Sequence, residues 1–203
     1  MRGISLRLFR YLIIVLIVCV LAIASPQRCL AQEETRMIAS GQYFDVYGYA
    51  GIDIPSLLAA LDYQSFYPGS SLTGERGDFS AILAKTLDVI YLETSDILDI
   101  HIYSYHGAIQ FLPDVSAVDS IFYKYAGRSM HERSFYFHEK NTIYISVRDL
   151  ELGVLGHEIA HAIISHYFVV PPPVKVQEVL CGYVDFNLRK SRGKILPKNK
   201  HKD

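Results

Sequence analysis

Cysteine is scarce in this 203-residue sequence, which contains only Cys19, Cys29 and Cys181. The first two lie in or beside an apolar leader, so removal of the leader would leave one thiol. A single cysteine cannot form an intramolecular disulfide, which excludes the small secreted scaffolds that several disulfides hold together. The sequence also lacks internal repeats and low-complexity segments. Its stability must therefore come from a hydrophobic core, for which half of the residues are hydrophobic.

The chain has no apolar run of about 20 residues, the length that crosses a membrane as a helix. Its longest run covers residues 11–24, follows three arginines and ends before Ser25-Pro26. A basic start, a short apolar stretch and small residues up to Ala31 are typical of an export signal. We therefore predict that residues 1–31 are a signal peptide and that the protein is periplasmic or secreted. The alternative is an uncleaved leader that anchors the domain outside the cytoplasm, because Arg28 is unusual so close to a cleavage site.

Basic residues are few in positions 32–188, where nine Lys and Arg accompany 20 Asp and Glu. An acidic body of this kind is not expected to bind nucleic acid, whose phosphates attract basic surfaces. Seven more Lys and Arg lie between Arg189 and Lys202. Such a tail could contact anionic lipid or nucleic acid. Short terminal charge runs are usually solvated, however, so residues 189–203 are predicted to be a disordered basic tail. Membrane contact is expected only through this tail or through a retained leader.

Hydrophobic periodicity predicts a single α+β domain over residues 32–188, in which a small, mostly antiparallel sheet carries packed helices. Strands are expected at residues 42–49 and 99–105 and in a hairpin formed by residues 134–138 and 142–147. Helices are expected at residues 54–61, 79–91, 115–125 and 174–188, with Gly127 as a stop signal for the third. Residues 68–77 form a Gly- and Ser-rich connection that is too short to separate domains.

A metal-binding pattern, His-Glu-x-x-His, occupies residues 157–161 within an apolar helical stretch. Histidines four residues apart lie one turn apart on the same helix face, so the rings of His157 and His161 can reach one ion. The carboxylate of Glu158 can then act as general base toward a zinc-bound water molecule, whose pKa zinc lowers to about 7. The pattern therefore predicts a Zn²⁺ site with a hydrolytic role.

A catalytic zinc site needs a third protein ligand and an open position for water. Three consecutive prolines at residues 171–173 end the motif helix, and the next predicted helix carries Glu178. A helix that returns after the prolines can bring this carboxylate to the metal. The predicted metal ligands are therefore His157, His161 and Glu178.

Four other residues near the motif are expected to have structural roles. His166 lies five residues beyond the second histidine, off the ligand face, and is expected to be a surface or core residue. Cys181 follows Glu178 by three residues and, as a lone thiol, is expected to fill the core more readily than to bind a metal. Gly153 and Gly156 are expected to let a strand approach the motif helix, or to serve ordinary tight packing.

The motif, the proline turn and the segment Gln177-Glu178-Val179-Leu180-Cys181-Gly182-Tyr183 together resemble the gluzincin zinc metallopeptidases, which include thermolysin-like enzymes. The resemblance covers residues 142–183, under a quarter of the chain. It implies a zincin-like active-site helix, a following helix that bears the ligand glutamate, and hydrolysis of peptide or protein substrates. The substrate would add as a strand along residues 142–147, and Tyr183 would donate a hydrogen bond to the oxyanion.

The chain also departs from related patterns. Thermolysin-like enzymes carry an aspartate four residues after the ligand glutamate, where this sequence has Gly182. Asp185 is the candidate to replace that aspartate as the residue that orients a histidine. Metzincins are excluded because Ile164 and Tyr167 occupy the positions of their glycine and third histidine.

Three functions follow from this sequence. The leading interpretation is a zinc metallopeptidase that hydrolyses peptide bonds through a water activated by Glu158. The first alternative is a catalytically inactive, zinc-stabilised binding or assembly protein of the cell envelope. Gly182 favours it, as does the lack of a histidine or arginine oxyanion partner after Tyr183. The second alternative is an anchored interaction domain without a metal.

Overall fold

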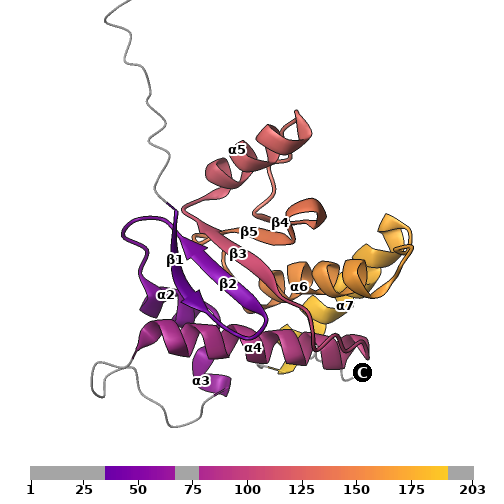
Figure 1. Ribbon diagram of the computed structural model, residues 1–203, viewed down its shortest axis with the longest axis horizontal. Coiled ribbons are helices and arrows are strands. Elements are labelled where there is room, and N and C mark those ends of the chain that lie inside the picture. Colours follow the sequence, from indigo (N-terminus) through magenta and orange to yellow (C-terminus); the bar gives the residue numbers. More distant parts are fainter. Residues whose placement is uncertain (1–34, 67–77, 192–203) are drawn as a thin grey trace, which may run out of the picture. The chain divides into compact units, whose positions relative to one another are not determined.

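The computed structural model describes residues 35–66 and 78–191, which belong to one unit that begins at Thr35. The strands are β1 (Arg36–Ser40), β2 (Phe44–Gly48), β3 (Gly107–Leu112), β4 (Ser134–Phe137) and β5 (Thr142–Ser146). The helices are α2 (Ile54–Ala60), α3 (Tyr63–Phe66), α4 (Phe79–Leu98), α5 (Val115–Ala126), α6 (Leu152–Tyr167) and α7 (Val174–Ser191), with a 3₁₀ turn at His138–Lys140 (Figure 1). The described part of the chain is therefore an α+β domain, as predicted.

Three sequence predictions fall wholly or partly outside these residues. The predicted signal peptide, residues 1–31, and the predicted connection at residues 68–77 lie outside the described part of the chain. The predicted tail does so from residue 192 onward, whereas α7 continues through Ser191. Among the described residues, no helix combines the length and the apolar character that crossing a membrane requires.

The sheet is open and mixed, with the strand order β1-β2-β3-β5-β4. Its two outer pairs, β1 with β2 and β5 with β4, are antiparallel, as predicted for the hairpin. The inner pairs, β2 with β3 and β3 with β5, are parallel. Helix α4 connects β2 to β3, and a crossover of this kind returns the chain in the same direction. The antiparallel character that the sequence suggested is therefore limited to the edges.

Short polar side chains and left-handed residues set the bounds of the long helices. Asp78 caps α4 by accepting hydrogen bonds from the amides of Ser80 and Ala81, and Asp114 caps α5 in the same way. Gly127 ends α5 in the left-handed conformation, with φ of 67°, as its predicted role requires. Asp99 ends α4 in a similar conformation. The helix therefore ends at Leu98, seven residues beyond the predicted end at residue 91.

The predicted strand at residues 99–105 is wrong, and the third strand begins at Gly107 instead. Aromatic packing explains the alternating pattern that suggested a strand. The hydroxyl of Tyr91 donates to the carbonyl of Ile102, and the ring of Tyr105 stacks on Tyr91 at 5.2 Å. Strand β1 was not predicted either, because its five residues, Arg-Met-Ile-Ala-Ser, do not alternate between polar and apolar, and three of them are exposed at the sheet edge.

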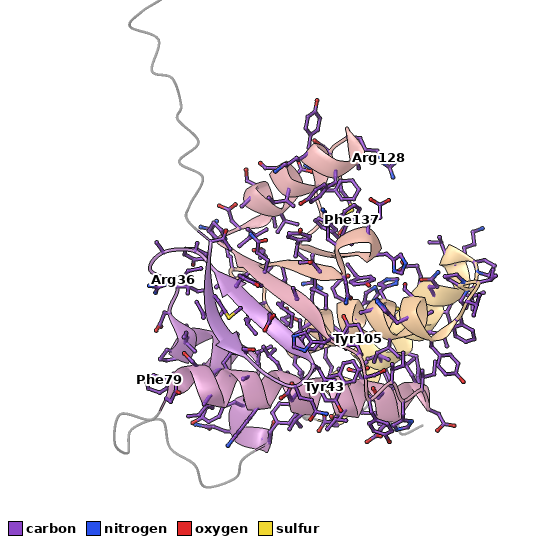
Figure 2. All side chains as sticks on the ribbon, viewed as in Figure 1. Arg36, Tyr43, Phe79, Tyr105, Arg128 and Phe137 are labelled. Carbon is purple, nitrogen blue, oxygen red and sulfur yellow. The ribbon has the colours of Figure 1, made fainter. Side chains whose placement is uncertain are left out.

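Helices cover both faces of β5, whose five residues are all buried. Ile143 and Ile145 belong to the main core with α4 and α6, whereas Tyr144 packs with Val118 of α5 in a smaller cluster. Successive side chains of a strand point to opposite faces, so α5 lies on one face of the sheet and α4 and α6 on the other (Figure 1). Figure 2 shows Phe137 on the α5 side.

Helix α7 packs against α6, and two glycines of α6 lie where the helices meet. A Cβ atom at Gly153 would collide with the Asp185 carboxylate, and one at Gly156 would collide with Leu188. These glycines therefore allow close approach of α7. The suggested approach of a strand is wrong, and the alternative of ordinary tight packing is confirmed. The tight contact fixes the position of α7 relative to the motif on α6.

Candidate metal centre

The motif lies on a helix that is largely buried in the core. Eleven of the 16 residues of α6 are buried, and its apolar side chains pack under the sheet. His157 and His161 are partly exposed, because they occupy the side of α6 that faces a cavity. A metal site built on such a helix needs little reorganisation, since its two histidines are already on one face.

One carboxylate faces both histidines. The Nε2 atom of His157 lies 3.4 Å from Oε2 of Glu178, and the Nε2 atom of His161 lies 3.3 Å from Oε1. The two imidazole rings are 5.0 Å apart between centroids. The structure therefore brings together the three residues that the sequence predicted as ligands. The proline turn at residues 171–173 separates α6 from α7 and permits this return.

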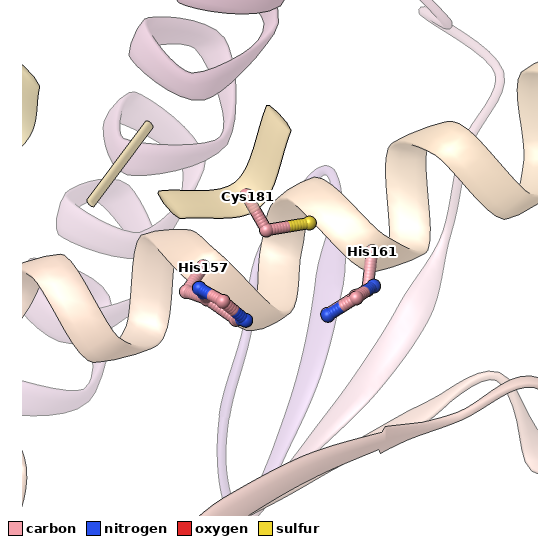
Figure 3. A group of neighbouring side chains, drawn as sticks. All are labelled: His157, His161 and Cys181. Carbon is pink, nitrogen blue, oxygen red and sulfur yellow. The ribbon is translucent and has the colours of Figure 1, made fainter. Parts of the chain in front are cut away.

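Cys181 lies beside the same histidines and forms an alternative third ligand. Its Sγ and one nitrogen from each of His157 and His161 lie within 4.8 Å of one another. Figure 3 shows its side chain reaching α6 between the two rings. Burial, and then the carboxylates of Glu178 and Glu158, raise the pKa of this thiol well above its usual range. A metal ion deprotonates a thiol that coordinates it, so the choice of third ligand rests on geometry. Glu178 is favoured because its two carboxylate oxygens contact both histidines.

The pKa of His161 is lowered, first by burial and then by the neighbouring His157, while Glu178 opposes the change. Imidazole binds a metal in its neutral form, so a lowered pKa favours that role. The contacts between the histidines and Glu178 would be full ion pairs only with protonated rings. A neutral ring facing a carboxylate through Nε2 is an arrangement that a cation between them would stabilise.

Glu158 is buried on the same wall, with 7% of its surface exposed. Its Oε1 atom accepts a hydrogen bond of 2.7 Å from the Ser134 hydroxyl, and the backbone amide of Tyr136 also donates to this carboxylate. Burial raises the pKa of Glu158 to about 7, the carboxylate of Glu178 adds to the shift, and the two hydrogen bonds oppose it. A carboxyl with this pKa can both accept and return a proton near neutral pH.

The cavity in front of the motif has a volume of about 700 Å³. One wall is β4 with His138, and the other is formed by α6 and the start of α7. Strand β4 is the edge of the sheet, whereas β5 pairs with β3 on one side and with β4 on the other. The expectation that a substrate would add along residues 142–147 is therefore wrong, because that strand has no free edge.

Tyr183 and Asp185, which were predicted to support the site, do not have the positions that those roles require. Tyr183 is 56% exposed and is not among the described residues that line the cavity. Asp185 lines the cavity, but its carboxylate pairs with Arg189 one turn further along α7. No described contact joins Asp185 to a histidine.

Two other side chains contact motif residues that the sequence left without partners. The hydroxyl of Ser134 donates a hydrogen bond to Glu158. The side chain of Gln177 lies within hydrogen-bonding reach of His161 and donates to the carbonyl of Pro172 at 2.8 Å. Gln177 immediately precedes Glu178, and this position beside a predicted ligand is the sequence signal that could have identified its contact with His161. His166, in contrast, bonds the carbonyl of Ala162 in its own helix.

Comparison of the chain with protein-family models, with curated proteins and with solved structures found no match. The chemistry of the site follows from its own residues: two histidines on one helix face, a carboxylate that meets both, and a buried glutamate beside them.

Proposed function

We propose that this protein is a zinc-dependent metallopeptidase of the gluzincin type, in which His157, His161 and Glu178 hold the metal. Helices α6 and α7 correspond to the active-site helix and the glutamate-bearing helix of that group. One observation carries the proposal: a single carboxylate meets the Nε2 atoms of both histidines at 3.3 and 3.4 Å beside a buried glutamate. Two imidazoles and one carboxylate are a donor set typical of catalytic zinc.

Zinc, when bound, supplies Lewis acidity that polarises a carbonyl group and lowers the pKa of water. Glu158 acts as the general base, accepting the proton of the attacking water and delivering it to the leaving amine. Its pKa of about 7 suits both steps. Ser134 and the amide of Tyr136 hold the carboxylate in place through hydrogen bonds from β4.

The substrate is an extended peptide that adds to β4. This strand is a sheet edge and also a wall of the cavity, so a peptide paired with it would pass in front of the motif. Main-chain hydrogen bonds to an edge position the substrate without selecting its side chains. Arg133 and His138 line the cavity at the two ends of β4 and are the candidates to stabilise the oxyanion in place of Tyr183. We also propose that the domain acts outside the cytoplasm, which rests on the export pattern of residues 1–31.

A second candidate function is a zinc-stabilised binding or assembly protein of the cell envelope. Two observations favour it: Tyr183 does not line the cavity, and Asp185 pairs with Arg189. Such a protein would hold zinc and cleave nothing.

Metal analysis combined with hydrolysis separates these functions. The purified protein should contain one zinc per chain by mass spectrometry of its metals. It should also cleave members of a peptide library, and chelation followed by zinc addition should abolish and restore the cleavage. Zinc without cleavage would favour the binding protein, and a metal-free protein that is folded and inert would contradict both.

A further inference from the structure

The connection between α6 and α7 exposes an apolar surface that the proposed chemistry does not use. We call it the α6–α7 tip, and its apolar members are Phe168, Val169, Val170 and Val174. Val169 is 100% exposed and Val170 is 82% exposed. Figure 1 shows this connection at the end of α6 and α7, away from the strands. Large apolar side chains exposed together on the surface of a folded domain mark an interaction surface.

The apolar surface continues from the tip along the outer side of α7. Four exposed residues recur at intervals of three and four: Val176, Val179, Tyr183 and Phe186. This spacing places them on one face of the helix. The opposite face, with Cys181, Val184 and Leu188, is buried against α6. Helix α7 is therefore apolar on two faces, of which residues 35–66 and 78–191 cover one.

We propose that the α6–α7 tip and the outer face of α7 insert into the interfacial layer of a lipid bilayer. Charge is the first reason for a lipid partner. Residues 167–177 contain no acidic side chain and a single charged one, the exposed Lys175. The two acidic residues of α7, Glu178 and Asp185, line the cavity instead. An apolar surface whose one charged side chain is a lysine is complementary to anionic headgroups above acyl chains.

The backbone of the tip supplies the second reason. Residues 171–173 are three prolines, which carry no N–H group. Burying a backbone donor without a partner is costly, so a proline-rich tip loses less on leaving water than an ordinary loop would. The carbonyl of Pro172 is also occupied, because it accepts a hydrogen bond from Gln177.

The sequence supplies the third reason, because an apolar run at residues 11–24 precedes the first described residue, Thr35, by about ten positions. Whether this run is an export signal or an anchor, it brings the domain to a membrane. In this proposal the tip contacts the membrane in addition to the contacts predicted for the leader and the tail. Its position next to Gln177 and Glu178 would hold the cavity close to the lipid surface.

Tryptophan fluorescence tests this proposal directly, because the chain contains no tryptophan. Val170→Trp in the full chain places one reporter at the tip, and Val169→Trp is an independent second reporter. Tyr123→Trp, at an exposed position of α5, is the matched control. Each protein is mixed with vesicles of phosphatidylethanolamine and phosphatidylglycerol, with and without bromine on the acyl chains.

Insertion predicts a blue shift and strong quenching by brominated lipid for the two tip reporters but not for the α5 control. Equal quenching of all three would overturn the proposal, because the leader alone would then hold the domain near lipid. Unquenched tip reporters would also overturn it. So would a blue shift that grows with protein concentration without vesicles, since a second copy would then cover the surface. The measurement requires neither metal nor hydrolysis, so its failure would leave the proposed peptidase activity unaffected.

Discussion

Ser134 donates a 2.7 Å hydrogen bond to Glu158 and thereby joins the edge strand β4 to the motif helix α6. Both residues are buried, so the carboxylate has few other donors within reach. The bond couples the strand on which we expect the substrate to lie with the residue that we propose as general base. Its removal should therefore affect both the fold and the chemistry.

Ser134→Ala should lower the free energy of unfolding by about 1–3 kcal/mol, the usual cost of leaving a buried polar group unsatisfied. Peptide hydrolysis should fall as well, because Glu158 would lose a positioning contact. Urea denaturation and a peptide assay measure the two effects. Ser120→Ala is the control, since its hydroxyl makes an exposed bond within α5. Equal stability of both variants would contradict the structural importance of the Ser134 bond.

Glu158→Gln should keep zinc and lose hydrolysis. Glutamine preserves the size of the side chain and can still accept from Ser134, but it cannot take a proton from water. The rate should fall by about 10²- to 10⁴-fold, the range for general base catalysis. Metal analysis and the peptide assay are made on the same sample. A variant that cleaves as fast as the parent would show that Glu158 is not the base.

The third ligand can be identified by comparing Glu178→Ala with Cys181→Ala. Removing a metal ligand should abolish stoichiometric zinc binding, so we expect that result for Glu178→Ala. Cys181→Ala should retain zinc and lose about 1 kcal/mol of stability, because it creates a small cavity between α6 and α7. Zinc titration with a competing chelator measures both variants. The opposite pattern would assign the site to the two histidines and the thiol.

Gln177→Ala should weaken zinc binding by about 10- to 100-fold, the effect of removing a residue that orients a ligand. The Gln177 side chain contacts His161, and its hydrogen bond to the Pro172 carbonyl helps to hold it in that position. Asp185→Asn should leave the zinc affinity nearly unchanged, because the partner of Asp185 is Arg189. If Asp185→Asn lost more zinc affinity than Gln177→Ala, Asp185 and not Gln177 would be the residue that orients a ligand.

Sequence patterns predicted those parts of the fold and site that depend on local spacing. Helix α5 carries its periodicity and its stop signal, Gly127, within 13 residues. Two histidines one turn apart must share a helix face, and three prolines must end that helix. These local rules suffice to place Glu178 on a separate, returning helix.

The remaining features depend on contacts between segments distant in sequence. Ser134 and Glu158 are 24 residues apart, and only the pairing of β4 with β5 over α6 brings them together. The edge position of β4 likewise follows from the parallel pairing of β3 with β5, which no local pattern encodes. The strand expected at residues 99–105 failed because alternating aromatic residues also occur where rings stack in a loop.

The last prediction concerns pH and a histidine far from the motif in sequence. The Nδ1 atom of His106 bonds the carbonyl of Gln42 at 2.9 Å, and its Nε2 atom lies 3.4 Å from the Asp45 carboxylate. The bond to Gln42 raises the pKa of His106, the Asp45 and Asp88 carboxylates add to the shift, and burial opposes it. The folded state therefore binds this proton more tightly than the unfolded state, in which the histidine pKa is about 6.5.

A raised pKa in the folded state means that this stabilisation is fully present below about pH 6.5 and is lost as the pH rises through the folded value. His106→Gln should therefore cost stability at low pH and little above the folded pKa, so the difference between the two proteins should shrink as the pH rises. Urea denaturation from about pH 5 to pH 9 measures this difference, and the comparison removes the contributions of other histidines. Asp45→Asn should reduce the same pH-dependent component. If the difference between the parent and His106→Gln stayed constant across this range, the His106 proton would not contribute to the stability of the fold.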